Sequence, residues 1–260
     1  MYQLSNYPHL RWYIANLRSI PGGSYHYGAS PANKRRGTKI TISPFRMGAT
    51  PVTWGMWKEY RQSFSVPGKE IKLPKDPGWG YPDDHPVVNV SWEDIMDSGG
   101  FCEWASGVAG FKLTLPTDAQ WEYAARGGKD GMEYPWGDNF DSSRLWCSEK
   151  PFDLERTAAV DRADRIYRNA YGLTDMVGNV KQWCTDFYNP DYLPVGKDPV
   201  NNISSSFKDL LGNARVGERC LRGGPWIFWD PSLFAFGVRA CTIPQSVSTA
   251  TGFRLAAGRK

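Results

Sequence analysis

The spacing of apolar residues along the chain predicts short helices with recognisable capping residues at their ends. Ser91 is a predicted N-cap, with acidic residues in the helical turn that follows it. Thr117 can cap a later helix, which Gly127 and Gly128 would end. The predicted helices are residues 10–17, residues 54–64, the stretch from Ser91 through Trp104, and residues 118–126.

Strands are fewer in this pattern, and irregular stretches are long. Residues 38–42 alternate polar and apolar side chains, which predicts a strand, and two more are predicted at 216–226 and 252–255. Residues 65–84 and 128–170 show no regular periodicity. Because irregular stretches of about 40 residues are uncommon in compact domains, we expect these loops to pack against the core.

Composition and charge favour one large globular domain. The chain has 260 residues, of which 41% are hydrophobic and 12 are tryptophan, so it can bury a sizeable core. The net charge is +4, and the only dense basic run, Lys34-Arg35-Arg36, lacks flanking aromatic residues. This run predicts a solvated loop rather than a nucleic-acid site.

No membrane or export signal stands out. No apolar stretch approaches the roughly 20 residues that a membrane-spanning helix needs. The first residues contain no basic region followed by an apolar run, so no signal peptide is predicted. The cytoplasm is the expected location, and a phage-borne or specially exported protein is the alternative.

The cysteines and histidines do not predict a metal centre. The five cysteines include no pair spaced as C-x-x-C, and the three histidines are well separated. Cys102 and Cys184 lie in apolar stretches that contain tryptophan, and we expect both to be core residues.

Eight ordered blocks carry the most specific signal. They are residues 45–48 with 51–53, 85–92, 101–104, 115–128, 134–137, 171–180, 221–226 and 252–254. In this order they resemble the formylglycine-generating enzyme, or sulfatase-modifying factor, family over residues 21–257. The resemblance implies a C-type-lectin-like α+β fold that is rich in loops, with small twisted sheets and two main helices. Residues 1–20 would be an N-terminal extension and 21–260 the domain.

The resemblance also locates the chemistry of the family, and this chain departs from it. The oxidases of the family hold copper through two cysteines, because soft thiolates bind Cu(I). The matching places are Phe228 and Leu233, and Cys241 lies too far along the chain to replace either. Iron-dependent relatives use several histidines of an added helical domain. We therefore expect no copper and no oxidase activity.

Residues 227–250 are similar to the mutagenised C-terminal segment of the variable proteins of diversity-generating retroelements. Large aromatic, aliphatic and small polar side chains stand between scaffold-type positions, which suits a binding surface. Phe234 is either part of this surface or a core residue. The candidate ligand-binding positions are Ile227, Phe228, Trp229, Asp230, Leu233, Phe236, Val238, Ala240, Cys241, Thr242, Ser246, Ser248, Thr249 and Ala250.

The resemblance also implies a calcium site in the loop after residue 173. The matching oxygen donors are Asp175, the carbonyls of Gly178 and Val180, and Gln182, which stands where relatives usually have Glu. Either calcium or hydrogen bonds alone would hold this loop. A second calcium site of the family falls on Arg144, a cation, and is predicted to be absent.

Three functions follow from these observations. The first is a non-catalytic protein that binds a protein or other macromolecular ligand through a segment diversified by a retroelement. The second is a divergent oxidoreductase of the sulfatase-modifying-factor class. The third is a structural subunit of a larger assembly.

Overall fold

The computed structural model describes residues 3–63, 71–149, 155–164, 166–204, 206–208, 212 and 214–258, and their regular elements are short. The helices are η1 (Leu4–Asn6), α1 (Pro8–Ala15), α2 (Trp54–Ser63), α3 (Trp92–Met96), α4 (Phe101–Ala109), α5 (Asp118–Arg126), η2 (Ser142–Arg144) and η3 (Pro231–Phe234). The strands are β1 (Leu17–Ile20), β2 (Gly23–Tyr27), β3 (Thr38–Ile42), β4 (Phe45–Gly48), β5 (Lys181–Phe187), β6 (Ser206–Lys208), β7 (Ala214–Val216), β8 (Arg219–Arg222), β9 (Ala240–Thr242), β10 (Thr251–Gly252) and β11 (Ala256–Gly258).

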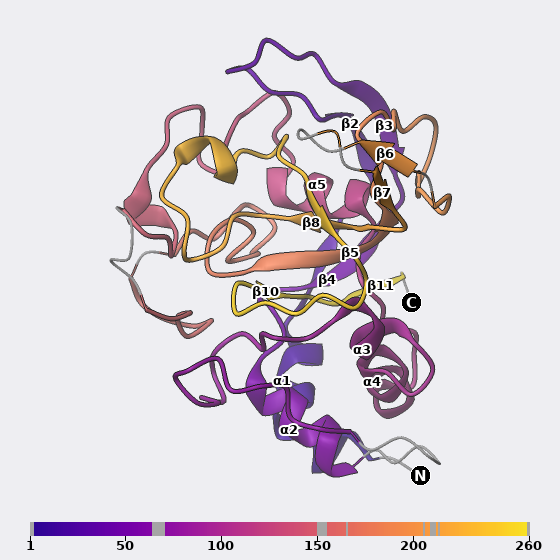
Figure 1. The fold of residues 1–260 in the computed structure, drawn as a ribbon, viewed down its shortest axis with the longest axis vertical. Helices are drawn as coiled ribbons and strands as arrows, with labels where there is room; N and C mark the ends of the chain where they lie inside the picture. Colours follow the sequence, from indigo (N-terminus) through magenta and orange to yellow (C-terminus); the bar gives the residue numbers. More distant parts are fainter. Residues whose placement is uncertain are drawn as a thin grey trace.

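Two small sheets organise the molecule. In the sheet β1-β4-β11, the central strand β4 pairs antiparallel with a strand from each end of the chain. The sheet β10-β5-β8-β9 contains the strands that flank the predicted binding segment. Helices α1 to α4 gather at one end of the molecule, and α5 packs against β5 and β8 (Figure 1).

Local capping signals correctly predict where α3 and α5 start. Thr117 accepts a hydrogen bond from the Gln120 amide, and the Gln120 side chain accepts one from the Thr117 amide, both at 3.0 Å. Ser91 and Asp94 form the same reciprocal box at α3. The helix predicted from Ser91 through Trp104 is nevertheless two helices, because Gly99 turns the chain with a φ of +71° between α3 and α4.

The N-terminal prediction needs correction. The helix predicted for residues 10–17 ends at Ala15, and Leu17–Ile20 forms β1, because pairing with β4 overrides the helical pattern. The Leu255 amide donates a hydrogen bond to the Tyr13 hydroxyl at 2.9 Å. The described part of the predicted extension therefore packs on the domain.

Strand predictions are right at β3 and too long near the C-terminus. The predicted strand 216–226 is the end of β7 followed by β8, and Gly223 turns the chain with a φ of +74°. The predicted strand 252–255 is interrupted after β10, because the buried Arg254 side chain donates to the carbonyls of Gly48 and Thr174. The sequence pattern predicts none of the strands β1, β2, β4, β5, β6, β9 and β11.

The core consists of two apolar clusters. Around α2 and α4, the rings of Trp57 and Phe101 stack at 5.4 Å, and Phe253 contacts Phe101 edge-on. The second cluster lies under α5 and the β2–β3 hairpin. Cys102 and Cys184 are buried, which confirms them as core residues. None of the described helices is long and apolar enough to cross a membrane.

A buried network of charges joins α5 to the sheet. The Arg222 guanidinium on β8 pairs with Asp118, and at 2.8 Å with Glu122. Asp118 also accepts from Arg239 at 2.9 Å and from the Tyr27 hydroxyl at 2.6 Å. Although burial opposes ionisation, the two arginines hold the pKa of the Asp118 carboxyl well below its usual range. The network therefore stays charged inside the protein.

Replacing Arg222 with Met should strongly destabilise the protein, because it leaves Asp118 and Glu122 buried with one cation fewer. Loss of one partner of a buried ion pair typically costs ~3–5 kcal/mol of unfolding free energy. Urea unfolding followed by circular dichroism measures this loss. Lys58→Met removes the partly exposed pair with Asp83 and should cost less than ~1 kcal/mol. Equal losses in the two variants would contradict a special role for the buried network.

Candidate functional site

The turn after β8 directs the chain to the surface. Gly223 has a positive φ, and a side chain at Gly224 would overlap the ring of Phe234. Phe234 can therefore pack directly on the backbone of this turn. The chain then runs along the surface as residues 226–233, and η3 turns it back toward the core.

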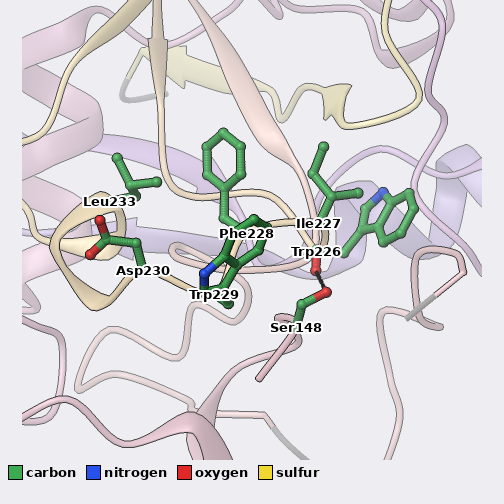
Figure 2. Close-up of a pocket in the computed structure, with 7 residues that line it drawn as sticks. All are labelled: Ser148, Trp226, Ile227, Phe228, Trp229, Asp230 and Leu233. Atoms are coloured by element: carbon green, nitrogen blue, oxygen red, sulfur yellow. Dashed lines mark hydrogen bonds between the residues drawn. The ribbon is translucent and has the colours of Figure 1, made fainter. Parts of the chain in front are cut away.

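Residues 226–233 enclose a pocket of about 540 Å³. Figure 2 shows Leu233 and Asp230 at one side of the pocket, Phe228 and Trp229 in the middle, and Trp226 with Ser148 at the other. The residues that line it are Ser148, Trp226, Ile227, Phe228, Trp229, Asp230 and Leu233. Its wall is mainly apolar, which is typical of a ligand-binding site.

Trp226 forms the fixed wall of this pocket. Its amide donates to the carbonyl of Asn179 at 3.0 Å, and its own carbonyl accepts from the amide of Ser148 at 2.8 Å and from the hydroxyl of Ser148 at 3.1 Å. Its indole N–H donates to the carbonyl of Thr249 at 3.1 Å. Four hydrogen bonds thus tie Trp226 to three separate parts of the chain.

Five predicted ligand-binding residues meet in the pocket: Ile227, Phe228, Trp229, Asp230 and Leu233. Trp229 is 47% exposed, although tryptophan is usually largely buried. Phe228 and Leu233, where the resemblance predicts that the family's copper-binding cysteines would fall, both line the pocket wall. The apolar pocket therefore stands where the resemblance places the oxidase chemistry.

Other predicted positions lie along the rest of the segment. Ala240, Cys241 and Thr242 form β9, which pairs with β8, and Val238 lies just before it; all four are half-buried. Ser246, Ser248 and Thr249 belong to the following loop, where the hydroxyls of Thr242 and Ser246 lie 2.8 Å apart. None of these positions is among the residues that line the pocket.

Two predicted positions are corrected by their burial. Phe236 is 1% exposed, its amide donates to the carbonyl of Glu133, and Arg126 covers its ring at 4.9 Å. Ala250 is buried as well, and its carbonyl accepts from the Lys181 amide. Buried side chains cannot contact a ligand in this structure. Phe234, left open between surface and core, is a core residue because it is fully buried.

Sequence reasoning missed three contributors to this surface. Ser148 comes from an irregular stretch without any distinguishing pattern, and its place in the pocket depends on tertiary contact with Trp226. Lys181, at the start of β5, places its ammonium 5.5 Å from the centre of the Phe228 ring. Burial lowers the pKa of Lys181, and Cys241 opposes this shift. Trp226 could have been found, because a tryptophan that follows the Gly223-Gly224 pair by one residue borders the segment.

The expected calcium donors do not fit a metal ion. Both carboxylate oxygens of Asp175 pair with the guanidinium of Arg162, at 2.7 and 3.0 Å, and this ion pair is buried. The carboxylate also accepts from the Asn179 amide group at 3.0 Å. A guanidinium thus occupies the position in which a cation would meet Asp175.

Gln182 is equally committed to protein partners. Its side-chain oxygen accepts from Trp121 at 2.9 Å and from Arg254 at 2.6 Å, and its nitrogen donates to the carbonyl of Asp175. Among the described residues, no group of three or more His, Cys, Asp or Glu side chains could hold a metal ion. The loop was expected to be held either by calcium or by hydrogen bonds alone. The observed contacts favour hydrogen bonds, together with the ion pair of Asp175 and Arg162.

The sequence of residues 11–259 matches the family described as the sulfatase-modifying factor enzyme 1-like domain. The chain belongs to this family. The formylglycine-generating enzyme of Thermomonospora curvata is 32% identical over 220 residues, which cover 80% of this chain and 68% of that protein. The inactive C-alpha-formylglycine-generating enzyme 2 of Bos taurus is 27% identical and covers 94% of this chain and 88% of its own length. Membership therefore includes both active enzymes and a relative named as inactive.

A solved structure confirms the fold. Treponema denticola variable protein 1 matches with a TM-score of 0.70 and 20% identity, covering 94% of this chain and 95% of that one. The predicted loop-rich α+β fold of the formylglycine-generating enzyme type is confirmed by this match and by the family. At this level of identity the structural match describes the fold alone.

Calcium should not change the thermal stability of the protein, because Arg162 already neutralises Asp175. The melting temperature measured in a chelator and in about 1 mM calcium, the range of weak extracellular sites, should be the same. Arg162→Met should lower the stability by ~3–5 kcal/mol, because it leaves a buried carboxylate unpaired. A melting temperature of the unmodified protein that rises with calcium would show that a metal site exists.

Proposed function

We propose that this protein is a non-catalytic binding protein whose pocket at residues 226–233 contacts a macromolecular ligand. The observation that carries the proposal is the pocket itself, with its apolar wall and exposed Trp229. Ligand pockets of proteins combine such walls with a few polar groups. The same surface region holds the two side chains, Phe228 and Leu233, that replace the family's cysteines.

The energetics of the pocket suit a binding role. Burying one large aromatic side chain contributes about 2–3 kcal/mol, and two such side chains stand in the middle of the pocket. Micromolar affinity corresponds to about 8 kcal/mol of net binding free energy. Phe228 and Trp229, with the half-buried Leu233 beside them, can provide a large part of this binding free energy, from which the costs of association are then subtracted.

The thiols of the described residues do not support copper chemistry. Cys102, Cys147, Cys184 and Cys220 are buried, and Cys241 is partly buried. Burial and a hydrogen bond to Glu218 raise the pKa of Cys241 to about 12, so its thiol stays protonated. A protonated thiol is a poor metal ligand, and no cysteine is among the residues that line the pocket.

A direct assay distinguishes the proposed binding function from the alternative, a divergent oxidoreductase. If the protein is a binding protein, incubation with copper and a peptide carrying a sulfatase motif should yield no aldehyde, because the pocket offers no thiolate pair. Mass spectrometry of the peptide measures the product, and the formylglycine-generating enzyme of Thermomonospora curvata serves as the positive control. Aldehyde formation with repeated turnover would overturn the non-catalytic assignment.

We further propose that the segment is diversified by a retroelement. The fold similarity to Treponema denticola variable protein 1 supports this. So does the arrangement of residues 227–233, where side chains at the pocket can change without disturbing the Trp226 hydrogen bonds, which use its backbone and indole.

Sequencing of the neighbouring DNA and of many copies of this gene tests the diversification. A near-identical template repeat and a reverse transcriptase gene should lie close downstream. Substitutions should concentrate at Ile227, Phe228, Trp229, Asp230 and Leu233, while Phe234 stays apolar because it is fully buried. Absence of both the repeat and the reverse transcriptase would contradict the proposed diversification, and it would not affect the proposal that the pocket binds a ligand.

A further inference from the structure

The polar groups that line the pocket restrict the chemistry of its ligand. The only polar side chains among the lining residues are those of Ser148 and Asp230 and the indole N–H groups of the tryptophans. The Ser148 hydroxyl is buried and donates to the carbonyl of Trp226, and the Trp226 indole donates to Thr249. The charge available to a ligand in the pocket is therefore the carboxylate of Asp230.

Asp230 is held in place with one oxygen left open. It caps η3 by accepting hydrogen bonds at Oδ1 from the amide of Ser232 at 2.9 Å and from the hydroxyl of Ser232 at 2.8 Å. Its Oδ2 has no hydrogen-bond or ion-pair partner within the part of the chain that the structure describes. Because the cap fixes the side chain at the edge of the pocket beside Leu233 (Figure 2), the free oxygen can meet a cation there without first losing side-chain freedom.

The nearby cation does not offer an equivalent site for an anion. Lys181 is not among the residues that line the pocket, and its ammonium lies against the Phe228 ring. The arginines closest in the chain, Arg222 and Arg239, pair with buried carboxylates. Within the pocket, electrostatics therefore favour a positive group on the ligand.

The surroundings of the pocket favour a protein as the ligand. Ile243 and Val247 are exposed on the loop that follows β9, and the hydrogen bond from Trp226 to Thr249 ties this loop to the pocket wall. Like Trp229, they are exposed apolar side chains of the same segment, and exposed apolar side chains of this kind are typical of protein interfaces. A small molecule in the pocket would leave Ile243 and Val247 uncovered.

We propose that the pocket takes an aromatic or branched aliphatic side chain from a protein segment whose neighbouring residue is Lys or Arg, with the cation paired to Asp230. This inference rests on the proposed binding function and specifies the chemistry of the partner. The apolar side chain supplies most of the affinity, and the cation selects the sequence.

Three capped tetrapeptides that differ in one residue test the proposal: Gly-Trp-Lys-Gly, Gly-Trp-Gln-Gly and Gly-Trp-Glu-Gly. Binding is followed by NMR through the indole N–H signal of Trp229, assigned with Trp229→Phe. The lysine peptide should bind about threefold more tightly than the glutamine peptide, as expected for a partly exposed ion pair. The glutamate peptide should bind most weakly.

Asp230→Asn is the matched variant, because asparagine keeps the oxygen that caps η3 and removes the charge. It should abolish the difference in affinity between the lysine and glutamine peptides, because the charge that distinguishes them is removed. Equal binding of all three peptides to the unmodified protein, or tightest binding of the glutamate peptide, would overturn the proposed ligand chemistry.

A neutral probe, 3-ethylindole, separates this failure from failure of the binding function. If 3-ethylindole binds to the pocket and the three peptides bind with equal affinity, the pocket is a binding site, and only the proposed preference for a cation is wrong. No shift of the Trp229 signal with any of the four probes would overturn both the pocket as a binding site and the inference built on it.

Discussion

The ion pairs of Arg222 with Asp118 and Glu122 are the constraint on which the rest of the structure depends. A guanidinium and carboxylates are tolerated in a protein interior only when their charges and hydrogen-bonding groups are matched. Matching them fixes α5 against β8. The same guanidinium also donates to the carbonyls of Phe236 and Val238, so it orients the chain that returns from the pocket.

Side chains replace regular secondary structure elsewhere in the frame. Backbone groups in buried loops need partners, and here amides provide many of them. Asn169 donates to the carbonyls at the end of α5, and Asn179 bonds both the amide and the carbonyl of Ala158. This explains how a chain with so few strands and helices keeps one conformation. The hydrogen bonds of Trp226 attach the start of residues 227–233 to this frame, and the side chains of Ile227, Trp229 and Asp230 are exposed.

The pocket combines a fixed wall with side chains that do not hold it in place. Phe228 and Leu233 line it, and the carboxylate of Asp230 lies at its edge. The hydrogen bonds of Trp226 use its backbone and its indole, so they hold the wall independently of the side chains at residues 227–233. Under the proposed function, these side chains provide the contact surface.

The sequence by itself determined the family and the starts of α3 and α5, and it showed that residues 228 and 233 are not cysteines. Capping boxes such as Thr117 with Gln120 act over three residues, and the identity of residue 228 needs no fold to be known. Only the tertiary structure decided which aromatic residues of the segment face solvent. Phe234 and Phe236 are buried while Phe228 and Trp229 line the pocket, because Gly224, Arg126 and the turn of η3 give each ring its neighbours. The ion pair between Arg162 and Asp175 is also visible only in the tertiary structure, because an irregular loop brings the two residues together and no sequence periodicity predicts such a contact.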